Sequence, residues 1–199
     1  MAVFVSMFIF ALIGAISPGP VNIIATGAGA NFGFKRALPH VFGATLGYTL
    51  IVFLVGMGLN KVLEAYPQIT STLQYFGAAF LLYMSFKIAT AKPMADEARV
   101  DKRPPNVLEG ALSQGLNPKA WLVSMSGVSL FVAANTPALM YLLAFCLISF
   151  VVCFFGVGTW AAIGHLIRNL LANERHQVFF NRAMGLLLSS TVVTILSSQ

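Results

Sequence analysis

The chain has 199 residues, of which 58% are hydrophobic and only 9% are charged, and its formal net charge is +6. A soluble domain of this size could not cover so large an apolar fraction with so few charges, so the composition excludes a soluble globular protein and predicts a multi-span membrane protein. The basic residues lie between the apolar runs, as in loops that face anionic lipid, and this placement argues against nucleic-acid binding.

The first apolar run starts at the N-terminus. No Lys or Arg precedes it, whereas Lys35 and Arg36 follow it. A signal peptide has the opposite order, with a basic segment before the apolar one. We therefore expect a retained transmembrane helix that enters the membrane from outside.

Six apolar runs are long enough, at roughly 20 residues each, to cross a bilayer as helices. They fall at residues 3–30, 38–60, 70–91, 108–134, 137–165 and 178–197. Basic residues end or follow the odd-numbered runs: Lys35, Arg36, Lys87, Lys92, Arg99, Lys102, Arg103, Arg168, Arg175 and Arg182. The opposite side carries only Lys61. The positive-inside rule then predicts that the basic loops are cytoplasmic and that both termini lie outside.

Prolines interrupt the first and the fourth apolar run. Pro18 and Pro20 forbid a continuous helix through the first run, where Ser17 is placed to cap a new helix. Pro118 ends one helix just before Asn117 and starts another, for which Asn117 is the expected N-cap. Each of these runs is therefore predicted to be two half-helices.

The breaks lie at matching places in two halves of the chain. Pro18 precedes Pro118 by 100 residues, and Gly-Met-Gly at 56–58 precedes Gly-Val-Gly at 156–158 by the same number. A single glycine pair is explained as well by chance as by homology, but two matching proline breaks are harder to attribute to chance. Each half has three spans, an odd number, so the second half is expected to be inverted relative to the first.

The expected fold class is thus an all-α membrane protein with six transmembrane helices in two inverted three-helix repeats, in which helices 1 and 4 are broken. The repeats are predicted at residues 1–91 and 108–199. Residues 92–107, rich in proline and charge, are predicted to be a cytoplasmic linker.

The half-helices that begin at Pro20 and Pro118 would direct two positive helix ends toward the middle of the membrane. Unpaired N–H groups there must find a partner, and a carboxylate suits them. Lys119 strengthens the case, because a cation in the first turn of a buried helix is costly without an anion. The nearest acidic residue in the sequence is Glu109. A substrate carboxylate is the natural candidate, and an internal partner is left open.

A small zwitterion would be bound by the residues around both breaks. The candidate substrate-binding residues are Ser17, Pro18, Gly19, Pro20, Asn22, Gln114, Asn117, Pro118 and Lys119. Structural interpretations are equally acceptable for four of them: Ser17 and Asn117 as helix caps, and Asn22 and Gln114 as hydrogen-bonded bridges between helices. Neither a catalytic group, a cofactor nor a metal is expected.

Other polar, aromatic and sulfur-containing residues are assigned to packing or to the membrane surface. The aromatic residues expected to pack or to anchor at the interface are Tyr48, Trp121 and Trp160. His40, His165 and His176 are expected to be solvated near the cytoplasmic ends, with His165 a possible proton relay. Cys146 and Cys153 are seven residues apart in one predicted helix, too far for a disulfide.

The motifs at the two breaks, Ser17-Pro-Gly-Pro20 with Asn22 and Asn117-Pro-Lys-Ala120, resemble those of the LysE/RhtB amino-acid exporters, over nearly the whole chain. Residues 77–79, 87–90 and 164–166 are similar to the cysteine/O-acetylserine exporter branch of that family. The resemblance implies export of small amino acids from the bacterial cytoplasm, in exchange for protons. The partners it implies are a small zwitterionic amino acid, the proton and membrane lipid, with a homo-oligomer left open.

One position departs from the family pattern. Many members carry an acidic residue after the glycine of span two, where this chain has Gly47 and Tyr48. The residue that couples transport to protons therefore cannot be transferred from those members.

Two other classes of function remain to be weighed. A transmembrane electron carrier would need cysteines in the first and fourth spans, whereas Cys146 and Cys153 both lie in span five. A passive pore or a subunit for membrane-protein assembly is the stronger alternative, because the sequence does not reveal alternating access.

Overall fold

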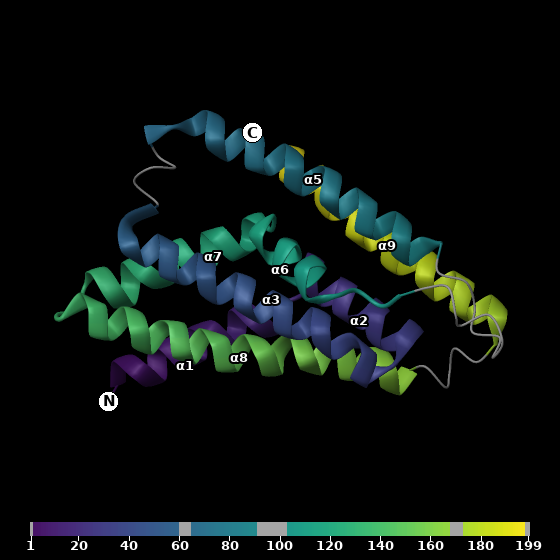
Figure 1. The fold of residues 1–199 in the computed structure, drawn as a ribbon, viewed down its shortest axis with the longest axis horizontal. Coiled ribbons are helices and arrows are strands. Elements are labelled where there is room, and N and C mark those ends of the chain that lie inside the picture. The colour runs from purple at the N-terminus through teal and green to yellow at the C-terminus, as the bar shows by residue number, and fades with distance from the viewer. Residues whose placement is uncertain (1, 60–64, 91–102, 168–172, 198–199) are drawn as a thin grey trace.

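A computed structural model describes residues 2–59, 65–90, 103–167 and 173–197, and every regular element in these ranges is a helix (Figure 1). The elements are α1 (Ala2–Ile16), α2 (Pro20–Phe32), α3 (Phe34–Leu54), η1 (Val55–Leu59), α5 (Pro67–Ala89), α6 (Val107–Gly115), α7 (Pro118–Val128), η2 (Ser129–Ala133), α8 (Ala138–Leu166) and α9 (Glu174–Ser197). Here η1 and η2 are wider π-helical turns that continue α3 and α7. The predicted all-α fold class is confirmed.

Among the described residues, two helices are long and apolar enough to cross a bilayer alone: Phe34–Gly58 and Ala138–Leu166. A third span is formed if α1 and α2, bent by 61° at their break, count as one. Helices also occupy the other predicted runs, as α5, as α6 with α7, and as α9. That each of these crosses the membrane stays a prediction.

The start of α3 differs from the prediction. α3 begins at Phe34, rather than at residue 38, and includes Pro39. A proline inside a helix lacks the N–H that would bond to the carbonyl four residues earlier. Here that carbonyl belongs to Lys35, an exposed residue of the first turn.

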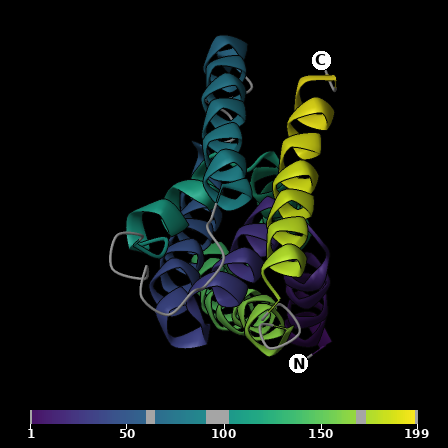
Figure 2. The ribbon, with the colours of Figure 1, turned by 90° about the vertical axis from the view of Figure 1, so that its right-hand side faces the viewer.

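The helices form two groups. α5 and α9 lie side by side along one edge of the molecule and contact the remaining helices mainly through α2 (Figures 1 and 2). Their contact contains the buried side chains of Leu81, Met84 and Leu188, and the Ser85 hydroxyl donates to the Gly185 carbonyl at 2.7 Å. A larger apolar cluster fills the space among α1, α2, α3, α7 and α8.

Glycines allow two pairs of helices to touch backbone to backbone. In the contact of α2 with α8, a Cβ on Gly29 would collide with the Ala161 carbonyl, and one on Gly164 with the Thr26 carbonyl. In the contact of α3 with α6, Gly43 and Gly110 play the same part, since a Cβ on either would collide with the facing backbone. Only glycine permits this spacing.

The contact of α2 with α8 lies toward one end of the molecule. The turn between α2 and α3, where Gly33 has φ of 86°, lies at the right of Figure 1, whereas the start of α6 lies near the middle. The N-terminus and the end of α9 lie toward the left. Of the predicted linker, residues 103–106 are non-helical. Residues 92–102, with Lys61 and Arg168, lie outside the described residues.

Candidate functional site

At the first helix break, side chains donate hydrogen bonds to the carbonyl oxygens at the end of α1. The amide nitrogen of Asn22 donates to the carbonyls of Ala15 at 3.1 Å and Ser17 at 2.9 Å. The Ser17 hydroxyl donates to the Gly14 carbonyl at 3.1 Å. The Ser17 hydroxyl replaces the helical donor that Pro18 cannot supply, and Asn22 satisfies two further carbonyls at the end of α1. Asn22 thus joins α2 to the end of α1 through hydrogen bonds.

Ser17 does not cap α2, as the sequence suggested it could. The N-cap is Gly19, in an extended conformation and without a side-chain cap. Ser17 lies too far before Pro20 to hold the position from which a cap reaches the first turn, and its hydroxyl turns back onto α1. No acceptor among the described residues meets the N–H groups of Val21 and Asn22, so the start of α2 keeps two unpaired donors.

At the second break, Asn117 caps the start of α7. Asn117 is the N-cap of α7, as predicted: its side-chain oxygen accepts from the Lys119 N–H at 3.2 Å, and its carbonyl accepts from Ala120 at 2.9 Å and Trp121 at 3.4 Å. Its amide nitrogen donates to the Gln114 side chain at 3.1 Å. The first-turn donors of α7 are therefore already used. The expectation of two helix ends with free donors is corrected to one, the start of α2.

Trp121 has a polar role that the sequence did not reveal. Its indole N–H donates to the carbonyl of Gly115, the last residue of α6, at 2.8 Å, and its ring packs against the core. The tryptophan thereby satisfies an orphan carbonyl at the end of α6. Trp160 packs against the same core, as expected.

Lys119 joins the two breaks. Its ammonium nitrogen lies 2.7 Å from the carbonyl oxygen of Ser17, 2.7 Å from the Ser17 hydroxyl oxygen and 3.4 Å from the carbonyl oxygen of Pro18. A cation is favourable at the negative end of a helix, here the end of α1. This end is the internal partner that the sequence left open, and it consists of neutral oxygens. The side chain crosses Gly19, where a Cβ would lie 3.4 Å from the ammonium.

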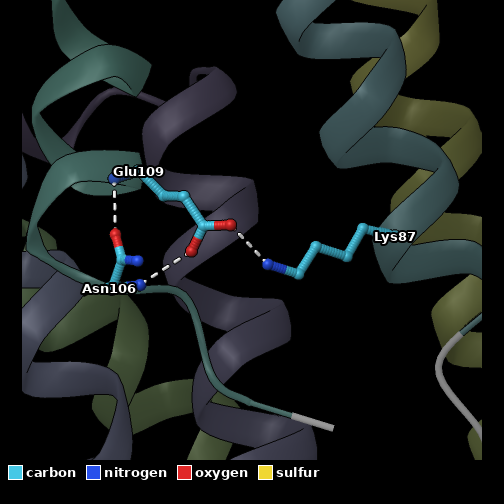
Figure 3. Close-up of polar contacts among 3 residues, drawn as sticks. All are labelled: Lys87, Asn106 and Glu109. Carbon is cyan, nitrogen blue, oxygen red and sulfur yellow. Dashed lines mark hydrogen bonds and ion pairs between the residues drawn. The ribbon is translucent and has the colours of Figure 1, made fainter.

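Glu109 is occupied elsewhere. Its carboxylate lies 2.6 Å from the Lys87 ammonium and accepts the Asn106 N–H at 2.8 Å, while the Asn106 side chain accepts the Glu109 N–H at 2.9 Å (Figure 3). This capping box starts α6, and the ion pair ties α6 to α5. Lys119 therefore shares no bond with the acidic residue nearest to it in the sequence.

A small cavity of about 40 Å³ lies between the two breaks. Five predicted site residues line it: Gly19, Asn22, Gln114, Asn117 and Lys119. Ser17, Pro18, Pro20 and Pro118 shape the breaks but do not line the cavity. A buried water needs roughly 10–15 Å³ of such space, so the cavity has room for a few waters and the helices must move apart to admit a larger solute.

The sequence did not predict that residues of α8 and α3 would line the cavity. Ser149 and Cys153, one turn apart on α8, and Tyr48 on α3 line it. The Gln114 amide donates to the Cys153 sulfur at 3.8 Å. Ser149 is completely buried, and its hydroxyl has no partner among the described residues. Polar residues within a span are functional candidates by default, and that rule would have identified Ser149.

His40 was predicted to be solvated and is instead completely buried. The prediction was wrong because α3 starts earlier than expected, which places His40 on the side of the helix that contacts Gly110 of α6. Neither ring nitrogen makes a well-formed hydrogen bond within the described part of the chain, and the backbone of Val21 on α2 is its nearest polar neighbour. His165 and His176 are exposed, as expected. Cys146 and Cys153 are buried free thiols, also as expected.

Comparison with known proteins matches the chain to a family. The LysE type translocator family matches the chain over residues 12–199. A Cysteine/O-acetylserine efflux protein of Salmonella typhi is 33% identical over 187 residues, which cover 94% of this chain and 93% of the relative. The protein of that name from Escherichia coli (strain K12) is 30% identical with the same coverage. No solved structure matches the chain.

Proposed function

The chain belongs to the LysE type translocator family, and on that premise we propose that it is a secondary transporter that exports small amino acids or close derivatives from the bacterial cytoplasm across the inner membrane. Cysteine and O-acetylserine, named for its relatives, or another small neutral amino acid would be the substrate. The observation that carries the proposal is the cavity between two helix breaks, with Lys119 on its wall.

The substrate carboxylate would bind at the Lys119 side of this cavity. The ammonium now bonds only neutral oxygens, and the start of α2 adds the unpaired N–H groups of Val21 and Asn22. A carboxylate would form charge-assisted hydrogen bonds with these donors, about twice as strong as neutral ones. Ser17, Pro18, Pro20 and Pro118 would act by keeping the two breaks open.

The architecture proposed for this activity is six membrane spans in two inverted repeats, residues 1–91 and 108–199, joined by a cytoplasmic linker. Inverted repeats with broken helices allow two halves to move about a central site. The helix order supports this arrangement, because the N-terminus and the end of α9 lie toward the end opposite the α2–α3 turn (Figure 1). Both termini would then be periplasmic.

Coupling to proton antiport would require a buried group that gains and loses a proton. His40 is such a group, since it is completely buried and faces the backbone of Val21 on α2 without a well-formed hydrogen bond. Glu109 on α6 and Lys87 on α5 are the charged groups that act on it from neighbouring helices. We assign coupling to His40 because it is a completely buried titratable group; it lies outside the cavity, whose lining contains no acidic side chain.

Counterflow in proteoliposomes tests the proposal. A carrier exchanges labelled external amino acid for unlabelled amino acid inside, so label accumulates transiently above equilibrium. A passive pore only equilibrates the label, and an assembly subunit moves none. Equilibration without overshoot would overturn the proposal in favour of a pore.

A further inference from the structure

The Ser149 hydroxyl is buried without a hydrogen-bond partner among the described residues. It is completely buried on α8, lines the cavity and has no hydrogen bond within the described residues. Leaving a buried hydroxyl unpaired is unfavourable, so such groups in native proteins usually meet water or a ligand. The cavity on which Ser149 lies is the proposed substrate site.

The surroundings of Ser149 indicate which part of a substrate it meets. One turn away on α8 lie the buried Phe145 and the thiol of Cys153. A single neutral hydroxyl in such surroundings is a poor site for an ammonium group, because a desolvated charge needs several strong acceptors. A neutral hydroxyl or thiol, by contrast, requires only one donor or acceptor, which Ser149 supplies.

Ser149 also comes from a different wall of the cavity than the proposed carboxylate site. Lys119 belongs to α7 and the unpaired N–H groups belong to α2, whereas Ser149 belongs to α8. A small amino acid whose carboxylate binds at Lys119 therefore has its side chain available for the α8 wall.

On the basis of the proposed function, we propose that Ser149 is a specificity-determining residue, whose hydroxyl bonds the neutral polar atom on the β-carbon of a small amino acid, such as the oxygen of serine or the sulfur of cysteine. An amino acid without that atom leaves Ser149 unpaired in the complex. A site built to bond a substrate hydroxyl discriminates against the analogue that lacks it.

The test compares L-serine with L-alanine, which differ by one oxygen atom. Purified protein in detergent is titrated with each amino acid, and the rise in thermal stability gives both affinities, since a ligand of the folded state stabilises it. The wild type should bind serine about 2- to 10-fold more tightly than alanine, the effect of one net hydrogen bond. Ser149→Ala should bring this ratio close to one, because serine loses its hydrogen-bond partner and alanine no longer leaves a buried hydroxyl unpaired.

Ser124→Ala is the matched control. Ser124 is also completely buried but does not line the cavity, so its replacement should preserve the ratio. A wild type without preference for serine, or a Ser149→Ala variant that keeps the preference, would overturn the assignment of Ser149 and leave the transporter intact. A wild type stabilised by no amino acid would overturn the proposed substrate class, and the role of Ser149 with it.

Discussion

The ammonium of Lys119 lies 2.7 Å from both the carbonyl and the hydroxyl oxygen of Ser17, a residue 102 positions earlier in the chain. Lys119 is unfavourably placed with respect to its own helix, because a cation in the first turn opposes the dipole of α7. The contact offsets this cost by placing the charge at the end of α1, where the dipole favours it. One side chain thus couples the two breaks.

Replacing Lys119 by Met should affect both stability and binding. Methionine keeps an unbranched apolar stem but removes the bonds to Ser17, and hydrogen bonds to a charged group contribute about 1.5–3 kcal/mol. We expect the free energy of unfolding to fall by about this amount. The affinity for a free amino acid should fall about 10- to 100-fold, whereas that for its carboxamide should change little. Thermal titration with both compounds measures this.

Lys119→Arg is the charge-preserving control, expected to be intermediate because a planar guanidinium does not reproduce the compact contacts of an ammonium. If Lys119→Met still strongly prefers the free acid to the carboxamide, the carboxylate binds at the start of α2 without the lysine.

Pro118→Ala should weaken transport while leaving insertion and expression intact. A proline inside a helix costs about 3 kcal/mol relative to alanine, so its removal favours a continuous helix through α6 and α7. Counterflow rates and expression levels measure the two effects. Pro39→Ala is the control, because Pro39 is exposed inside the continuous α3 and forms no break. Equal rates in wild type and Pro118→Ala would show that the break is not required.

In two separate variants, Ala134→Cys and Arg175→Cys, the introduced cysteines should react with a membrane-impermeant thiol reagent from opposite sides of the membrane. Both positions are exposed, the first at the end of η2 and the second at the start of α9. The proposed topology places Ala134 in the periplasm and Arg175 in the cytoplasm. The parent chain should remain unlabelled, because Cys146 and Cys153 are buried. Labelling of both from the periplasm of intact cells would contradict the six-span topology.

His40→Asn should separate exchange from proton coupling. Counterflow moves no net protons and should persist, whereas transport driven by an imposed pH gradient should fall to the rate without a gradient. His165→Asn is the control, since His165 is exposed at the end of α8. Undiminished gradient-driven transport in His40→Asn would assign coupling to another group, with Glu109 of the ion pair in Figure 3 the next to test.

The sequence was sufficient to predict features that depend only on neighbouring residues in the chain. Proline removes a donor and fixes φ wherever it occurs, so the end of α6 and the Asn117 cap of α7 could be predicted from a few residues. Contacts between distant segments could not. The bond from Lys119 to Ser17 depends on how α7 meets α1, and the burial of His40 depends on how α3 meets α6.

The four glycines that bring α2 against α8 and α3 against α6 also bear on how a carrier of this design could be studied. In the proposed topology, the contact of α2 with α8 lies at the cytoplasmic end, which would open to load substrate. At Gly29 and Gly164 the two helices meet backbone to backbone, without a Cβ between them. An added methyl at Gly29 or Gly164 would prop this end apart and shift the population toward the cytoplasm-open conformer. Such alanine variants would give a trapped state for structural work.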